Sequence, residues 1–147
     1  MADWVDNGNA LTRAEWSENA REQHRLKSII NDRSSNIHRI DEDIEKLELA
    51  IQDTDRAIEG FRDAANDMQL LESEVALVFR GESSVAFLSK VTNYKNYCLK
   101  RIENMESLKA NYSNQIKQLK YQKFMAQNLI NTLREHLERL RRALVRR

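Results

Sequence analysis

Apolar residues recur in this chain at alternating spacings of three and four residues, along two long stretches separated by a single glycine, Gly81. A mean spacing of 3.5 residues is the repeat of α-helices that pair as coiled coils. The apolar seam of the first stretch comprises Trp16, Leu26, Ile30, Ile37, Ile40, Ile44, Leu47, Ile51, Ile58, Phe61, Ala65 and Met68. That of the second comprises Leu88, Val91, Cys98, Ile102, Met105, Tyr112, Ile116, Leu119, Ala126, Ile130, Leu133, Leu137, Leu140 and Leu144. Polar residues fill four further seam positions, namely Asn19, Gln23, Arg33 and Thr54.

The start of the first helix is marked by local capping chemistry. The 147 residues include no proline and only three glycines, and no run alternates apolar and polar residues as strands do. Thr12 and Glu15 have the spacing of a capping box, and Leu11 and Trp16 that of a hydrophobic staple. Long helices are therefore the expected secondary structure, and the first begins near Thr12.

Gly81 is the expected C′ residue that ends the first helix, and residues 82–84, Glu-Ser-Ser, offer caps for the second. The sequence thus predicts a flexible N-terminal leader over residues 1–11 and a single helical domain over residues 12–147. Within that domain we expect helix one over about 12–79, a turn at about 79–84 and helix two over about 83–145.

Charge is divided unevenly about this glycine. Residues 1–81 contain 10 Lys/Arg and 18 Asp/Glu, whereas residues 82–147 contain 14 Lys/Arg and 5 Asp/Glu. Opposite charge favours pairing of the two halves with each other. An antiparallel alignment in which paired residue numbers sum to about 163 matches the two seams. It pairs Leu26 with Leu137, Ile30 with Leu133, Ile44 with Leu119, Ile58 with Met105 and Ala65 with Cys98, and sets Thr54 opposite Lys109 as a polar break.

The predicted fold class is therefore all-α, a long antiparallel two-helix hairpin of coiled-coil type. In this alignment the acidic run at residues 41–45 flanks Lys117, Lys120 and Lys123. Such exposed ion pairs contribute little individually, but their pattern selects the antiparallel arrangement and its register. An antiparallel dimer, in which the chain does not turn at Gly81, satisfies the same pattern and remains open at this stage.

Residues with catalytic or ligand-binding chemistry are sparse. The three histidines, His24, His38 and His136, are far apart and none has a zinc-ligand spacing. Cys98 is alone and falls on the seam, which favours a packed side chain over a nucleophile. No glycine-rich phosphate loop is present, and the carboxylates fall on the expected solvent face. We therefore predict a protein that is not an enzyme and has no metal or cofactor.

Targeting and membrane segments are not indicated. The N-terminus is acidic and lacks an apolar core, so no secretory signal peptide is expected, and no stretch approaches the roughly 20 apolar residues of a membrane helix. We expect a cytoplasmic protein. The arginines near the C-terminus are interrupted by Glu135 and Glu138 and lack interleaved aromatics, so a solvated, partly paired helix end is favoured over a nucleic-acid or membrane contact.

Helix two carries more apolar residues than one seam requires. Aromatic and aliphatic side chains beside the seam are typical anchors of a second, partner-binding face. The predicted partner contacts are Phe87, Tyr94, Tyr97, Tyr121, Phe124 and Leu129. Leu108 and Met125 also fall beside the seam of helix two, as do Leu49, Leu70, Leu71 and Val78 beside that of helix one. The alternative is scattered exposure around a wide seam.

A helical hairpin with a bulky residue and a glycine at its tip resembles the WXG family of type VII secretion. The matching turn motif is Phe79, Arg80 and Gly81, followed by Phe87 in the next helix, with phenylalanine where that family has tryptophan. The length of the helices is more similar to the longer hairpins that accompany LXG toxins in Gram-positive bacteria. This resemblance implies an adaptor or targeting chaperone that binds the helical N-terminal domain of a secreted toxin.

The resemblance also bears on partners and export. It implies a hetero-oligomer, with a second small hairpin protein as a further partner. The family's secretion signal is an aromatic residue followed four positions later by an acid, and Tyr97, Tyr112, Tyr121 and Phe124 are not followed by one. Another subunit would then supply the signal, and the chain would leave the cell with its partner by a signal-peptide-independent route.

Two other resemblances remain as alternatives. The stalk proteins of flagellar and type III export apparatus are antiparallel two-helix coiled coils of similar size that insert into a hexameric ATPase. A generic coiled-coil scaffold subunit is the third alternative, because seam and charge patterns alone are shared by all three classes.

Overall fold

The computed structural model describes residues 12–78 and 81–145 and consists of two α-helices. Helix α1 spans Arg13–Val78 and helix α2 spans Glu82–Val145. The prediction of an all-α helical hairpin is confirmed. The observed bounds compare with predicted bounds of about 12–79 for helix one and about 83–145 for helix two. The predicted leader over residues 1–11 lies outside the described residues, as do Phe79 and Arg80 of the predicted turn motif.

Helix α1 begins with the predicted capping box. The Thr12 amide donates to Glu15 Oε2 at 3.3 Å, and the Glu15 amide donates to Thr12 Oγ1 at 3.1 Å. The Thr12 carbonyl accepts the first backbone bond of the helix, from the Trp16 amide at 2.9 Å. These reciprocal bonds satisfy amides at the helix start that have no partner within the helix. Leu11, the other half of the predicted staple, lies outside the described residues.

The N-cap of helix α2 is Gly81 rather than one of residues 82–84, where the sequence placed its caps. Gly81 has a φ of 121°, and its carbonyl accepts the first bond of α2 from the Val85 amide at 3.1 Å. Glu82 is already the first helical residue. Gly81 therefore occupies the cap with a φ that is accessible to glycine and strained for residues that carry a Cβ.

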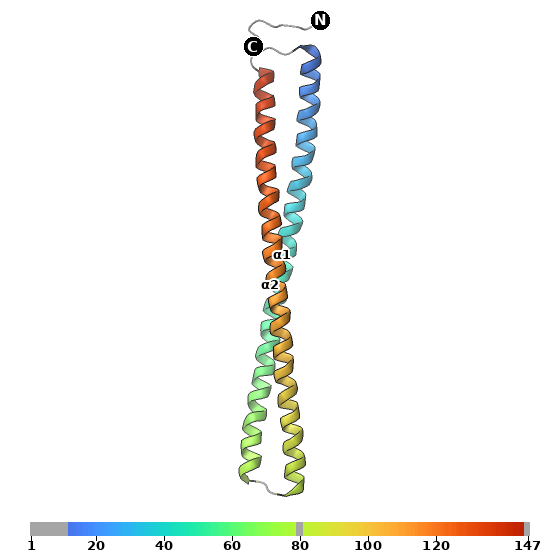
Figure 1. The fold of residues 1–147 in the computed structure, drawn as a ribbon. Coiled ribbons are helices and arrows are strands. Elements are labelled where there is room, and N and C mark those ends of the chain that lie inside the picture. The colour runs from blue at the N-terminus through green and yellow to red at the C-terminus, as the bar shows by residue number, and fades with distance from the viewer. Residues whose placement is uncertain (1–11, 79–80, 146–147) are drawn as a thin grey trace. The chain divides into compact units, whose positions relative to one another are not determined.

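Two compact units make up the hairpin, and each is described by itself. The terminal unit comprises Met1–Ile44 and Gln118–Arg147, and the turn unit comprises Glu45–Lys117. Within each unit, a segment of α1 and a segment of α2 lie side by side and run in opposite directions (Figure 1). Both segments bury their seam residues against each other, so each unit has a narrow apolar core.

The core of the terminal unit follows the predicted register. Its buried cluster consists of Leu26, Ile30, Ile130 and Leu137, with Ile37, Leu133 and Leu140 packed against it. Beside this cluster, the Lys123 ammonium lies 2.8 Å from Asp41 Oδ1, and the residue numbers of this pair sum to 164. The antiparallel register of about 163 therefore holds in this unit.

A buried amide links the two helices nearer their ends, to a carbonyl about one helical turn away from the residue that this register would pair with it. Asn19, one of the polar seam positions, is only 8% exposed. Its Nδ2 donates to the Leu140 carbonyl at 3.0 Å, and its Oδ1 accepts from Gln23 Nε2 at 2.8 Å. Trp16, placed in the seam by its spacing, is instead 40% exposed. Its partner in this register would fall near residue 147, which lies outside the described residues.

The turn unit buries a second core. Its buried side chains are Ile58, Ala65, Val75, Val91, Cys98 and Ile116. Cys98 is completely buried, as its seam position predicts. Val75 was not recognised in the sequence because the polar Glu72 interrupts the repeat just before it. The seam of α1 therefore continues beyond Met68, where the predicted repeat ended.

Gly81, at the start of α2, and Gly60, within α1, give a matched test of this fold. We expect Gly81→Ala to lower the free energy of unfolding by about 1–3 kcal/mol, because alanine at this φ is strained. A Cβ added at Gly60 would meet nothing within 4 Å, so Gly60→Ala should raise the free energy of unfolding by about 0.5–1 kcal/mol. Urea unfolding followed by circular dichroism measures both. Equal effects of the two substitutions would contradict the strained position of Gly81.

Candidate protein-interaction surfaces

All six predicted partner contacts lie on the exposed surface of α2. Phe87, Tyr94 and Tyr97 belong to the turn unit, whereas Tyr121, Phe124 and Leu129 belong to the terminal unit. Their exposed fractions range from 38% for Leu129 to 64% for Tyr121. These residues thus form two separate groups, and each group is considered within its own unit.

The aromatic group of the turn unit packs partly onto the seam. The Tyr94 and Tyr97 rings are stacked, with centroids 6.2 Å apart and an interplanar angle of 27°. Tyr97 also meets Phe61 of α1 edge to face, at 6.4 Å and 73°. Both geometries are favourable for aromatic pairs. Tyr97 therefore connects the exposed surface to a seam residue, and part of its apolar area already serves the helix pair.

A solvent-open groove of about 750 Å³ runs between α1 and α2 in the terminal unit. Two predicted contacts, Tyr121 and Leu129, line it, whereas Phe124 does not. Its walls are formed by Arg33, Asn36, Arg39, Ile40 and Asp43 of α1 and by Tyr121, Gln122, Met125, Ala126 and Leu129 of α2. The groove combines exposed apolar side chains with a few polar ones, which is the usual composition of a recognition site.

Met125 is an exposed apolar residue of the groove that was not among the predicted contacts. It is 50% exposed and lies between Tyr121 and Leu129 at spacings of four residues along α2. Residues four apart lie on the same side of a helix, so this spacing was the available indication. Methionine suits such a position because its flexible, polarisable side chain adapts to different apolar partners.

The two flanks of the terminal unit differ in charge. On the flank that carries the Asp41–Lys123 ion pair, acidic and basic side chains of the two helices meet. On the groove flank, Arg33 and Arg39 have no ion pair within the described residues. Unpaired guanidinium groups beside exposed apolar side chains are well suited to binding carboxylates of a partner.

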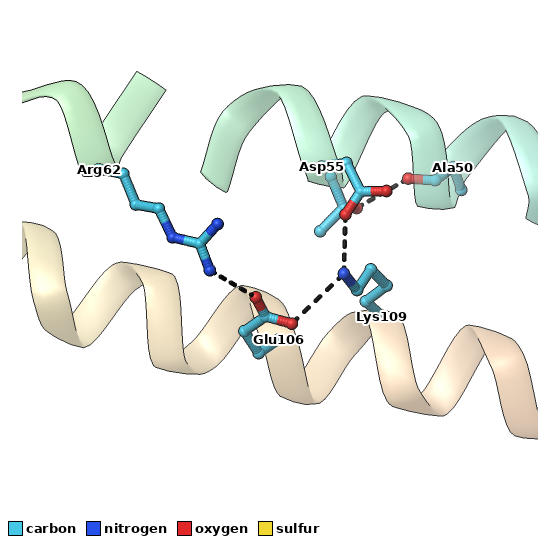
Figure 2. Close-up of polar contacts among 6 residues, drawn as sticks. Ala50, Asp55, Arg62, Glu106 and Lys109 are labelled. Atoms are coloured by element: carbon cyan, nitrogen blue, oxygen red, sulfur yellow. Dashed lines mark hydrogen bonds and ion pairs between the residues drawn. The ribbon is translucent and has the colours of Figure 1, made fainter. Parts of the chain in front are cut away.

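A chain of alternating charges crosses between the helices of the turn unit (Figure 2). Lys109 Nζ lies 2.8 Å from Asp55 Oδ1 and 3.4 Å from Glu106 Oε2, and Arg62 Nη2 lies 3.3 Å from Glu106 Oε1. Lys109 was predicted to lie opposite Thr54 as a polar break. The Thr54 hydroxyl instead donates to the Ala50 carbonyl of its own helix at 2.7 Å, so Lys109 pairs with the neighbouring Asp55.

This network holds Lys109 in its charged form. The hydrogen bond to Asp55 is the main cause that raises the pKa of Lys109 above its ordinary value of 10.5, and the hydrogen bond to Glu106 adds to it. A lysine that acts as a base or nucleophile needs a lowered pKa. The arrangement therefore favours a structural role, in which the ion pairs connect α1 to α2 in one register.

We expect Asp55→Asn to lower the melting temperature at pH 8. Because the pKa of Lys109 is raised in the folded state, the stability that this pair contributes is fully present below pH 10.5 and is lost as the pH rises through the folded-state pKa. The difference from wild type should therefore shrink above pH 10.5, as measured by circular dichroism melts between about pH 8 and 11.5.

Asp53→Asn is the matched control. Asp53 pairs with Arg56 of its own helix at 3.5 Å, and both side chains are more than three-quarters exposed. Arginine does not titrate in this range, so the control should show a small effect without pH dependence. An Asp55→Asn effect that stays constant to the alkaline end of the series would contradict the assignment.

Several charged residues near the helix ends of the terminal unit form ion pairs within their own helices. Arg141 and Arg142 each approach Glu138 at 3.8 Å. Glu22 pairs with Arg25 of α1, whose hydrogen bond lowers the pKa of the Glu22 carboxyl. The described part of the sequence contains no group of three or more side chains placed to hold a metal ion, and neither helix is apolar enough over a sufficient length to cross a membrane.

Comparison with protein-family models, with curated proteins and with solved structures finds no match to this chain. Its function is therefore inferred from the surfaces described above.

Proposed function

We propose that this chain is a non-enzymatic adaptor that binds a helical domain of another protein. The observation that carries the proposal is the groove of the terminal unit, where Tyr121, Met125 and Leu129 remain exposed between two helices. Apolar side chains of this size, lined up at helical spacing beside a groove, are the usual anchors for an amphipathic helix. Burial of these side chains against a partner helix would supply the binding free energy.

The partner that we propose is the helical N-terminal domain of a toxin exported by type VII secretion, with a second small hairpin protein in the same hetero-oligomer. Two features support this choice. The fold is an all-α hairpin with two long helices, and the Phe79-Arg80-Gly81 turn sequence resembles the WXG motif. In this role the chain keeps the toxin domain competent for export and accompanies it by a signal-peptide-independent route.

The test is affinity purification of the tagged chain from its native host, with identification of bound proteins by mass spectrometry. We expect a large protein with a helical N-terminal domain and a toxin domain. The double variant Tyr121→Ser/Phe124→Ser should lose that protein, because both side chains are more than half exposed and removing them takes apolar area from the surface. Its helical content, measured by circular dichroism, should be unchanged.

Leu70→Ser/Leu77→Ser is the matched control, since it also removes two strongly exposed apolar side chains, from α1 of the turn unit. This control should retain the partner. Retention of the toxin by the Tyr121→Ser/Phe124→Ser variant would contradict the proposed surface. Recovery of a hexameric export ATPase in place of a toxin would contradict the proposed partner and would favour the stalk alternative.

A further inference from the structure

The groove of the terminal unit is bordered by two stripes with coiled-coil spacing. On α1, Arg33, Asn36, Ile40 and Asp43 follow one another at intervals of three, four and three residues, and all of them line the groove. On α2, Gln122, Met125 and Leu129 follow at intervals of three and four. Both helices already use their own seams for each other. Arg33 and Ile40 were also placed in the predicted seam of α1, but Arg33 is exposed and Ile40 is only half-buried, so both remain accessible from the groove. The two stripes therefore present to the groove the surface that two helices offer to a third in a three-helix coiled coil.

The stripe on α2 is free of formal charge. Extended in both directions at the same spacing, it reads Gln118, Gln122, Met125, Leu129, Thr132 and His136. Lysines are nevertheless frequent in this part of α2, and one of them, Lys123, pairs with Asp41 on the other flank. Depletion of charge along one line of a charged helix is typical of a face that becomes covered by protein.

The α1 side of the groove carries more positive than negative charge. Two guanidinium groups, Arg33 and Arg39, stand against one carboxylate, Asp43, and no ion pair involves these three side chains in the part of the chain that is described. A covering helix with basic side chains at these positions would be repelled. A helix with acidic side chains at these positions would form charge-assisted hydrogen bonds to both arginines.

We infer that the groove binds one acidic amphipathic helix of another protein, which completes a three-helix coiled coil with the terminal unit. This inference rests on the proposed adaptor function and specifies the chemistry of its partner. The covering helix places apolar residues of a heptad repeat against Ile40, Met125 and Leu129, and it directs glutamate or aspartate side chains at Arg33 and Arg39.

The inference is tested with two synthetic helical peptides, each about three heptads long. Both carry the same leucines at heptad positions, and the flanking positions are glutamate in one peptide and lysine in the other. Binding of fluorescein-labelled peptide to the full chain is measured by anisotropy at about 50 mM salt, where screening is weak. We expect the glutamate peptide to bind at least about tenfold more tightly than its lysine twin.

Three variants of the chain locate the binding site. Arg33→Glu/Arg39→Glu should reverse the preference, so that the lysine peptide binds more tightly. Met125→Lys should abolish binding of the glutamate peptide, because it places a charge within the apolar part of the groove. Phe124→Ser should leave binding unchanged, because Phe124 neighbours Met125 in sequence but does not line the groove. Circular dichroism checks that each variant stays helical.

Equal affinity of the two peptides, binding of neither, or binding that survives Met125→Lys would each overturn the inference. So would self-association of the chain in sedimentation velocity that Met125→Lys abolishes, because the groove would then hold a second copy. The proposed function is judged separately by the toxin pull-down. If Tyr121→Ser/Phe124→Ser loses the toxin while Arg33→Glu/Arg39→Glu keeps it, the adaptor function stands and the acidic-helix inference fails.

Discussion

Burial of one narrow apolar seam between antiparallel helices is the constraint on which the rest of this structure depends. Each helix has a single partner helix, so only the residues that repeat at intervals of three and four can be buried. Leu26 and Ile130 in the terminal unit, and Ile58 and Cys98 in the turn unit, reach almost complete burial, while the positions between them remain in contact with water. A pair of helices of this kind leaves much of its apolar surface exposed, and that surplus is available to a partner.

Polar residues within and beside the seam decide how the two helices are aligned. An apolar seam of similar residues tolerates shifts by a whole heptad, because the same contacts recur after seven residues. In the terminal unit, Asn19 forms its cross-helix hydrogen bond with the Leu140 carbonyl in one alignment only. In the turn unit, Lys109 likewise reaches Asp55 in one alignment only. The ion pairs retain contact with solvent and are individually weak, so their contribution is specificity of alignment more than stability.

The two flanks of the terminal unit differ in their surface chemistry. One flank of the terminal unit carries the Asp41–Lys123 pair, which is internal to the hairpin, and the other carries Arg33, Arg39 and the exposed groove side chains. Part of the excess positive charge in the second half of the chain is thus neutralised by ion pairs within the molecule. What remains for recognition is a mixture of apolar anchors and a few arginines, which suits a helical protein partner.

The sequence by itself determined the two helices, the capping box at Thr12 and Glu15, and the antiparallel alignment. These follow from local hydrogen bonding and from the period of the apolar repeat, which are properties of the chain alone. It also indicated that α2 has surplus apolar residues. Only the tertiary structure decided which of those residues share a groove, because adjacent positions on a helix point about 100° apart and the outcome depends on where α1 lies. The predicted contacts included Phe124 and not Met125, whereas Met125 lines the groove and Phe124 does not.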